Sequence, residues 1–503
     1  MNLLDAGRRL SATSIWQRQT EFYESVGIDA WRGSVPSRIT TSSYIARTYA
    51  RCIAAYIADT GARQVLIVEG GAGHGRFGYL CMQHLRELQQ AGLLGDAQWQ
   101  YVLTDIAERN IAFWQQHEGL APLIQAGIAD VARFAAGDSE LSLRHSHRTV
   151  TADNPSQHVV VIGNYFFDSL PIDVFRTQDD QLLECLPRIT QAADSDESDW
   201  QWEQRPVTDA AYDDDTLEQL VQHFSRHVRN GCFTIPTAGC RVLSDLRSWA
   251  TDGMLLLAAD KGYRHLEELH NRPLPTAIAH GGCYSFSVNF PAIAEWFQRQ
   301  QGQAFVSAHD APVVHVTAFA AAGDCPLQNL QREYHTGVGD FNPGEFHQLS
   351  RRWHDDQQIA LSRCLSLLRL SGHDALVFYQ LRRHIRRALP TADSAQRRAL
   401  TAALPLIERR YFHWGTDDIP FALAHLWEKL GHPSDAVRLY EQSLRLFGEH
   451  PTTLCNLARC HVQLDRPEAA LEFAARAMQL KPDSSTAAGL LQQLECGSES
   501  AAM

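Results

Sequence analysis

An apolar run leads directly into a glycine loop near residue 70, and this junction limits the fold more than any other stretch of the chain. Residues 65–68 read Val-Leu-Ile-Val, and Glu69 and the loop Gly-Gly-Ala-Gly-His-Gly at 70–75 follow without a break. The next residues, 76–88, have the pattern of a helix. A strand, a glycine turn and a helix in this order open a parallel α/β sheet. We therefore expect a Rossmann-like domain whose ligand lies at this loop.

The alternation of strands and helices continues after the loop. Short β-rich runs lie at 101–104, 159–163 and 255–259, with helical stretches between them. This spacing requires crossover connections and predicts a mostly parallel sheet. Two later runs, 304–307 and 313–318, flank a turn-prone segment and predict a closing hairpin.

The residues around the glycines separate three classes of glycine loop. A phosphate-binding P-loop needs Lys and then Ser or Thr after its last glycine, but Arg76 and Phe77 follow Gly75. A dinucleotide fingerprint that starts at Gly71 needs its third glycine at position 76, which is arginine. The remaining pattern, Glu-x-Gly-x-Gly-x-Gly, is the first motif of Rossmann-like methyltransferases.

This motif predicts S-adenosylmethionine as the cofactor. The cofactor carries no phosphate, so the glycines act by removing side chains and letting the backbone approach its ribose and amino-acid end. We predict cofactor-binding roles for Gly71, Gly73 and Gly75. Glu69, at the end of the strand, is predicted to meet the cofactor's ammonium group directly or through water.

Two further acids follow predicted strands. Asp105 ends the run 101–104, where a carboxylate can accept hydrogen bonds from both ribose hydroxyls. Asp130 follows a short apolar pair, Leu123-Ile124, and is predicted to contact the adenine amino group. Each acid alone is as well explained as a helix cap or a surface residue, and it is their order after successive strands that favours the cofactor site.

The acceptor side is predicted at the next strand end. The run 159–163 continues into Asn164 and Asp168, and ligands of open parallel sheets bind beyond the carboxyl ends of the strands. Asn164 and Asp168 are the predicted acceptor-side catalytic residues, with Asp168 orienting the nucleophile or taking its proton. Asp260, after the run 255–259, is a third catalytic candidate.

Several of these segments together resemble the MidA-type methyltransferases, a family that includes the mitochondrial complex I assembly methyltransferase. The resemblance covers about residues 15–325, and the block Asn-Tyr-Phe-Phe-Asp-Ser-Leu-Pro at 164–171 carries most of it. The other similar segments are 38–42, 69–75, 253–262 and 285–290. The resemblance implies a class I methyltransferase fold with a mostly parallel seven-stranded sheet. It also implies methyl transfer to an arginine of a partner protein.

The acids that the family uses around its acceptor are partly replaced here. Tyr165 stands at a Glu position, Lys261 replaces a Tyr, Asn289 replaces an acid, and Ser43 stands where a carboxylate is common. Carboxylates orient a guanidinium by bidentate pairing. The replacements therefore leave a neutral acceptor open beside the arginine that the resemblance implies.

A repeat dominates the C-terminal part of the chain, where the β pattern ends near residue 346. Its two copies lie 34 positions apart, which is the period of tetratricopeptide helix pairs. The recurring residues are Leu430, Ala436, Leu444 and Leu446 in one copy and Leu464, Ala470, Met478 and Leu480 in the other. Such repeats stack into solenoids that bind other proteins. The alternative is that they only brace the catalytic domain.

We therefore expect three regions. Residues 1–60 form an N-terminal helical cap, 61–345 a Rossmann-like methyltransferase domain with insertions, and 346–503 an all-α domain whose repeats are clear at 417–495. Acidic residues 194–199 predict a mobile loop, and the aspartates 213–215 predict a helix N-terminus.

Composition narrows the classes of partner. A net charge of -13 over 503 residues argues against general binding to nucleic acid or to an anionic membrane. No apolar run is long enough for a membrane span, and no secretory signal is visible. The 11 cysteines lack a paired spacing, which predicts a cytoplasmic protein with reduced thiols and no metal. The two histidines within 144–148 are read as part of a solvated loop.

The sequence thus predicts an S-adenosylmethionine-dependent methyltransferase acting on a protein or peptide that the helical domain recruits. Two alternatives stay open. One is a non-catalytic adaptor that binds the cofactor for structural support, and the other is a methyltransferase of a small molecule. The oligomeric state is not predicted.

Overall fold

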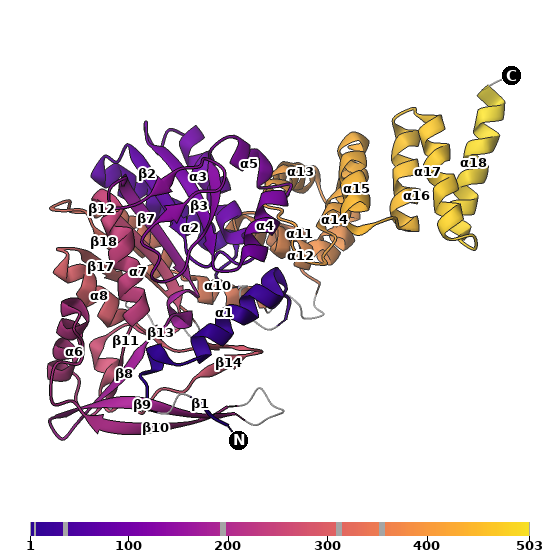
Figure 1. The fold of residues 1–503 in the computed structure, drawn as a ribbon. Helices are drawn as coiled ribbons and strands as arrows, with labels where there is room; N and C mark the ends of the chain where they lie inside the picture. The colour runs from indigo at the N-terminus through magenta and orange to yellow at the C-terminus, as the bar shows by residue number, and fades with distance from the viewer. Residues whose placement is uncertain are drawn as a thin grey trace. The chain divides into compact units, whose positions relative to one another are not determined.

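The computed structural model describes residues 2–4, 7–33, 39–191, 198–307, 314–351 and 358–501. The chain divides into two compact units, Met1–Gln348 and Leu349–Met503. The first unit contains the sheets and their covering helices, and the second is helical (Figure 1).

A seven-stranded sheet forms the centre of the first unit. Its order is β17-β18-β12-β7-β2-β3-β4, and every neighbouring pair is parallel except those of β18 with β12 and β17. In chain order the strands are β2 (Gln64–Glu69), β3 (Gln98–Asp105), β4 (Ala129–Arg133), β7 (Ser156–Asn164), β12 (Ala250–Asp260), β17 (Gln303–Val306) and β18 (His315–Ala321). This is the predicted mostly parallel seven-stranded sheet, and the four predicted runs and the closing hairpin are confirmed.

The third strand of the chain corrects one prediction. Leu123 and Ile124, which were read as a strand, lie in helix α5 (Ala121–Gln125), whose second residue is a proline. The strand is β4, and Asp130 is its second residue rather than a residue beyond its end. Proline at the start of a helix has the right φ and needs no backbone donor, which favours the helix here.

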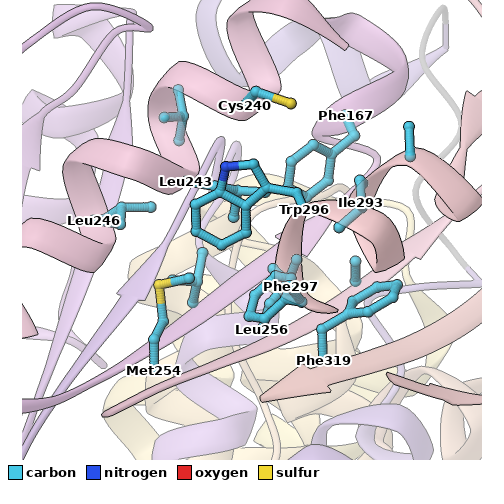
Figure 2. Packing of buried hydrophobic residues seen from close by; sticks show 14 of the residues in the cluster. Phe167, Cys240, Leu243, Leu246, Met254, Leu256, Ile293, Trp296, Phe297 and Phe319 are labelled. Atoms are coloured by element: carbon cyan, nitrogen blue, oxygen red, sulfur yellow. The ribbon is translucent and has the colours of Figure 1, made fainter. Parts of the chain in front are cut away.

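Helices cover both faces of this sheet. On one face, α6 (Asp215–His227), α7 (Thr237–Ser248) and α8 (Phe290–Arg299) pack over apolar side chains of β2, β7, β12 and β18. Figure 2 shows this core around Trp296 of α8, with Leu243 of α7 and Leu256 of β12 close by. Helices α2 (Ser43–Thr60) and α3 (Arg76–Gln90) cover the other face. The Tyr56 hydroxyl of α2 forms a hydrogen bond with His158 of β7 at 2.9 Å.

A second, antiparallel sheet was not predicted. It consists of β1 (Asn2–Leu4), β8 (Asp173–Gln178), β9 (Gln181–Gln191), β10 (Ser198–Pro206) and β11 (Cys232–Ile235). The predicted acidic loop 194–199 is wrong at its last two residues, which belong to β10, and its other residues lie outside the described chain. The predicted aspartate-rich helix start is confirmed, because Asp214 caps α6 by accepting a hydrogen bond from the Leu217 N–H at 2.9 Å.

The N-terminal region is mainly helical, and its first strand belongs to the second sheet. After β1 come α1 (Ile15–Val26), a 3-10 helix (Gly27–Arg32) and α2. Buried apolar residues of the N-terminus, among them Leu10 and Ile15, pack against Val174 and Ile189 of β8 and β9.

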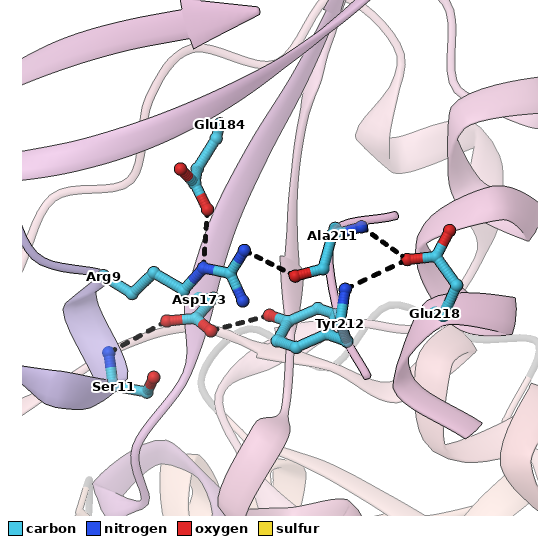
Figure 3. Close-up of polar contacts among 7 residues, drawn as sticks. All are labelled: Arg9, Ser11, Asp173, Glu184, Ala211, Tyr212 and Glu218. Atoms are coloured by element: carbon cyan, nitrogen blue, oxygen red, sulfur yellow. Dashed lines mark hydrogen bonds and ion pairs between the residues drawn. The ribbon is translucent and has the colours of Figure 1, made fainter. Parts of the chain in front are cut away.

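A polar cluster anchors the N-terminus to the second sheet (Figure 3). Asp173 of β8, which is 2% exposed, accepts hydrogen bonds from the Ser11 N–H at 2.9 Å and the Tyr212 hydroxyl at 2.6 Å. Arg9 pairs with Glu184 at 2.5 Å and lies over the Tyr212 ring. A buried carboxylate with these donors ties three separate segments of the chain together.

The replacement Asp173→Ala should destabilise the first unit. It leaves the Ser11 N–H and the Tyr212 hydroxyl without their acceptor, and we expect a loss of about 2 kcal/mol in the free energy of unfolding. The measurement is urea unfolding followed by tryptophan fluorescence. Asp209→Ala, at an exposed position in the loop after β10, is the matched control and should leave the urea midpoint of unfolding unchanged. Equal shifts in both variants would contradict the anchoring role.

The second unit is a series of antiparallel helices. Its helices are α11 (Leu361–Leu370), α12 (Ala375–Ala388), α13 (Ser394–Arg409), α14 (Ile419–Leu430), α15 (Pro433–Phe447), α16 (Pro451–Gln463), α17 (Pro467–Leu480) and α18 (Ser485–Ala501). The two predicted repeats are the pairs α14/α15 and α16/α17, and each second helix begins at a proline. None of the described helices is both long and apolar enough to cross a membrane.

Candidate active site

A cavity opens at the carboxyl ends of β2, β7 and β12. It contains about 720 Å³ of space between protein atoms, including open solvent at its mouth. Its wall combines the glycine loop, the segment after β7, the N-terminal region and the hairpin of β14 (Ile278–His280) and β15 (Cys283–Ser285). The lining residues used below are Tyr23, Trp31, Thr40, Thr41, Glu69, Gly71, Gly73, Asn164, Tyr165, Asp168, Lys261, His280 and Cys283.

The glycine loop needs its glycines for conformation and for space. Gly71, Gly73 and Gly75 have φ values of 62°, 57° and 80°, in the left-handed region that other residues rarely adopt. A Cβ on Gly73 would lie 2.7 Å from the Trp31 ring, and one on Gly75 would lie 2.8 Å from the Trp114 indole nitrogen. Gly71 and Gly73 line the cavity, whereas Gly75 begins helix α3 behind it.

Glu69 presents a buried carboxyl group to the cavity. It is 4% exposed, and its Oε2 accepts a hydrogen bond from the Tyr101 hydroxyl at 2.9 Å. Burial raises the pKa of Glu69 to about 8, an effect that the Tyr101 hydrogen bond opposes. A carboxyl group in this state gains most from a cation that reaches it through the cavity.

Asp105 holds the glycine loop from behind rather than lining the cavity. Its carboxylate accepts hydrogen bonds from the Gly73 N–H at 3.1 Å, the Ala107 N–H at 3.0 Å and the Asn110 amide at 3.0 Å. Burial raises the pKa of Asp105, and these hydrogen bonds oppose the rise. The contact that the structure provides is therefore to the loop itself, and the predicted ribose contact stays a prediction.

Asp130 lies outside the cavity wall. Its Oδ1 accepts from the N–H groups of Val131 and His145 at 2.8 and 2.9 Å, and its Oδ2 accepts from the Ser146 N–H at 2.9 Å. The carboxylate thus closes a turn on the neighbouring segment. The predicted adenine contact of Asp130 stays a prediction.

Asn164, the last residue of β7, and Tyr165, which follows it, both lie at the cavity. The Asn164 Oδ1 accepts a hydrogen bond from the buried Tyr49 hydroxyl at 3.0 Å, which fixes the amide. Tyr165 has φ 51°, a conformation uncommon for a residue other than glycine, and its N–H donates to the Ala259 carbonyl at 2.9 Å. Strain of this kind recurs at functional sites, and here it accompanies the turn that brings Asp168 back to the cavity.

Asp168 and Asp260 form a buried acid pair. They are 5% and 0% exposed, and the Asp168 N–H donates to the Asp260 Oδ2 at 3.1 Å. Burial and the neighbouring Asp168 carboxyl raise the pKa of Asp260 well above its usual range. Burial also raises the pKa of Asp168, while Ser169, Asp260 and Lys261 oppose the rise. Asp168 lines the cavity, whereas Asp260 is not part of its wall and contacts Asp168 from behind.

Several wall residues had no place in the sequence-based prediction of the site. Tyr23 and Trp31 come from the N-terminal region, and their rings stack with centroids 5.7 Å apart. His280 and Cys283 come from the β14–β15 hairpin, and the Tyr23 hydroxyl lies 3.5 Å from the Cys283 sulfur. The aromatic residues before the first predicted strand could have indicated a cavity wall. They lie too far along the chain from the glycine loop for the sequence alone to connect the two.

Comparison with protein families identifies the family of the chain that forms this cavity. Residues 45–304 match a family described as "Putative S-adenosyl-L-methionine-dependent methyltransferase". The match covers more than half of the chain. The chain belongs to this methyltransferase family. Residues 429–494 match the tetratricopeptide repeat family, which confirms the predicted repeats.

Solved structures of similar proteins lie at low identity. One is a "likely methyl transferase" from Burkholderia thailandensis bound to S-adenosyl-homocysteine, with 16% identity, a TM-score of 0.42, and coverage of 64% of this chain and 90% of that one. A native structure from the same organism gives 15% identity, a TM-score of 0.41 and coverage of 64% and 89%. The Cut9–Hcn1 complex matches 33% of this chain and 39% of its own at a TM-score of 0.20. Comparison with curated proteins gave no match.

The methyltransferase uses S-adenosyl-L-methionine, and the cavity residues fit it. Glu69 offers a buried carboxyl group for an ammonium, and the glycines remove side chains where Trp31 already closes the loop. Among the described residues, no group of three His, Cys, Asp or Glu side chains is arranged to hold a metal ion. The residues that fit the cofactor are thus those of the loop and of the β2 end.

A methyl group at residue 73 should disturb cofactor binding. In Gly73→Ala the new Cβ meets the Trp31 ring, and we expect at least about tenfold weaker binding of S-adenosyl-L-methionine by calorimetry. Gly92→Ala is the matched control, because Gly92 also has a positive φ of 75° but no atom near the position of a Cβ. Equal affinities of Gly73→Ala and the wild type would show that the cofactor does not lie at this loop.

Cofactor binding should release a proton from Glu69. With its pKa raised to about 8, the carboxyl group is protonated near neutral pH and must ionise to pair with an ammonium. Near pH ~6.5, where the cofactor's amino group is charged, we expect release of about one proton per cofactor. Calorimetry in buffers of different ionisation enthalpy measures it. Glu69→Gln should bind more weakly without this release, and Glu118→Gln, at an exposed position, should behave as wild type. Release that persists in Glu69→Gln would assign the proton to another group.

Proposed function

We propose that this methyltransferase modifies a polypeptide that its helical unit recruits. The observation that carries the proposal is that Asn164 and Asp168 line the same cavity as Glu69 and the glycine loop. A cofactor-binding wall and an acceptor-side wall then face one space. The tetratricopeptide repeats support a protein as the molecule that delivers the acceptor.

The residues divide into three roles. Glu69, Gly71 and Gly73 hold the cofactor, which supplies an activated methyl group when bound. Asn164, fixed by Tyr49, orients the acceptor, and Asp168 takes its proton. Asp260 is a positioning residue, since its carboxyl group supports Asp168 and does not line the cavity. Trp31 and Tyr23, whose rings stack, add an aromatic part to the wall of the cavity.

The acceptor group follows from the charges of the wall. The family resemblance implies arginine, and a guanidinium is best held by a pair of carboxylates. Asp168 is the acid available on this side, Tyr165 is neutral, and Lys261 lines the same cavity. The ammonium of Lys261 repels a second cation, so these charges favour a neutral acceptor side chain on the polypeptide over a guanidinium.

Asp168→Asn tests the catalytic role. The replacement keeps the size of the side chain but removes its capacity to take a proton, and we expect about a hundredfold slower methyl transfer. Transfer of labelled methyl groups to proteins of a cell extract is the measurement. Cofactor affinity should stay within about twofold of wild type, because Glu69 and the loop are untouched. Asp245→Asn, at a half-buried position of α7 outside the cavity wall, is the matched control.

The two alternatives give different results in the same assay. Label found only in small molecules would replace the polypeptide acceptor with a metabolite. Cofactor binding without transfer to any component would favour the adaptor. Either result would overturn the proposed function.

A further inference from the structure

The helical unit distributes charge unevenly between its helices. We call α12, α14 and α16 the first helices, and α13, α15 and α17 the second helices, of three successive pairs. The first helices contact one another in series, α12 with α14 and α14 with α16. They carry six Arg and Lys residues and one carboxylate, whereas the second helices carry six Arg residues and five carboxylates. Positive charge is thus concentrated on one row of helices.

These charges converge across three helix pairs. His425 of α14 is acted on by the positive charges of Arg386 on α12, Lys429 on α14 and Arg459 on α16, which add to burial in lowering its pKa. Glu428 opposes them. Arg383 and Arg386 are exposed on α12, and the Lys429 and Arg459 side chains are 51% and 37% exposed. The cations are therefore both grouped and accessible.

The one carboxylate of the first helices is turned inward. The Glu428 side chain is 4% exposed, and its Oε2 accepts a hydrogen bond from the Tyr440 hydroxyl at 2.8 Å. Its Oε1 lies 3.4 Å from the Arg459 Nε and 3.9 Å from the Lys429 Nζ. Asn456 donates to the Tyr440 hydroxyl and accepts from Arg459. Glu428 and Asn456 thus hold Arg459 in place, and a ligand meets the cations rather than the acid.

Such a face is complementary to carboxylates. Guanidinium groups pair with carboxylates in a bidentate manner, and the single carboxylate of Glu428 leaves an excess of positive charge on this row of helices. The chain as a whole has a net charge of -13, which opposes the long phosphate backbone of a nucleic acid. A short acidic stretch of polypeptide can stay within range of the local cations, so that opposition acts on fewer of its charges.

We propose that the face of Arg383, Arg386, Lys429 and Arg459 on the first helices binds an acidic polypeptide segment of the partner protein. The proposal rests on the proposed recruitment of a polypeptide and names its chemical class. It also extends the docking surface beyond the two clear repeats onto α12.

Fluorescence anisotropy on the full-length protein tests this face. The probes are a labelled peptide rich in Glu and Asp and its neutral counterpart with Gln and Asn. We expect the acidic peptide to bind and the neutral one to bind at least about tenfold more weakly, with a steep loss of affinity at higher salt. The variant Arg386→Glu with Lys429→Glu should lose at least about tenfold in affinity for the acidic peptide.

A matched control reverses two charges on the second helices. Arg398 and Arg445 are exposed on α13 and α15, and Arg398→Glu with Arg445→Glu should leave peptide affinity within about twofold of wild type. Circular dichroism and cofactor affinity report whether either double variant is still folded. Equal loss in both folded variants would overturn the proposal, because only the overall charge would then matter.

Three other results would also overturn it. Equal binding of the acidic and neutral peptides would remove the charge argument. Binding of a single-stranded oligonucleotide as tightly as the peptide, with loss in the same variant, would make this a nucleic-acid surface. Self-association that the first-helix variant abolishes would make it an interface between copies. Methyl transfer is measured separately, so peptide binding without transfer would refute the proposed function and leave this surface intact.

Discussion

One buried carboxylate fixes the shape of the cofactor side. Asp105 accepts hydrogen bonds from the backbone of Gly73 and Ala107 and from the Asn110 amide. These donors join the glycine loop to the end of β3 and the start of the following helix. A charge buried at this depth is tolerable only while its donors remain, so the left-handed path of the loop and the position of Asp105 depend on each other. Glu69 is the last residue of β2, and it lines the cavity together with Gly71 and Gly73 of the loop that follows.

The N-terminal region completes the same site from a distance. Arg76, buried at the first turn of α3, donates to the Thr41 carbonyl, so the glycine loop and a segment before α2 are tied together. Trp31 lies over Gly73 and stacks on Tyr23. The Asp173 cluster then anchors the start of the chain to the second sheet. The N-terminal wall of the cavity is therefore fixed both near the glycine loop and at the start of the chain.

The sequence predicted the parts of the site that follow directly from a strand. Glu69, Asn164 and Asp168 were found because each stands next to an apolar run. The strand before Asp130 was misplaced because the apolar pair Leu123-Ile124 belongs to a helix that begins with Ala121 and Pro122. Two apolar residues cannot show whether a segment is a helix or a strand. Trp31 and Cys283 were missed because contacts between segments far apart in the chain bring them to the cavity. The second sheet was missed for a related reason, since β1 pairs with β9 across nearly 190 residues.

The charges of the cavity suit a cationic cofactor and the proposed neutral acceptor in different ways. Three carboxyl groups, Glu69, Asp168 and Asp260, are almost fully buried, and burial raises the pKa of each. A cation that reaches Glu69 favours the ionised carboxylate, which pairs with the cation more strongly than the neutral carboxyl group would. On the acceptor side, burial and the neighbouring Asp168 carboxyl raise the pKa of Asp260, and Lys261 supplies a positive charge. Lys261 therefore already provides a positive charge on the acceptor side. At Glu69 the positive charge must come from the ligand.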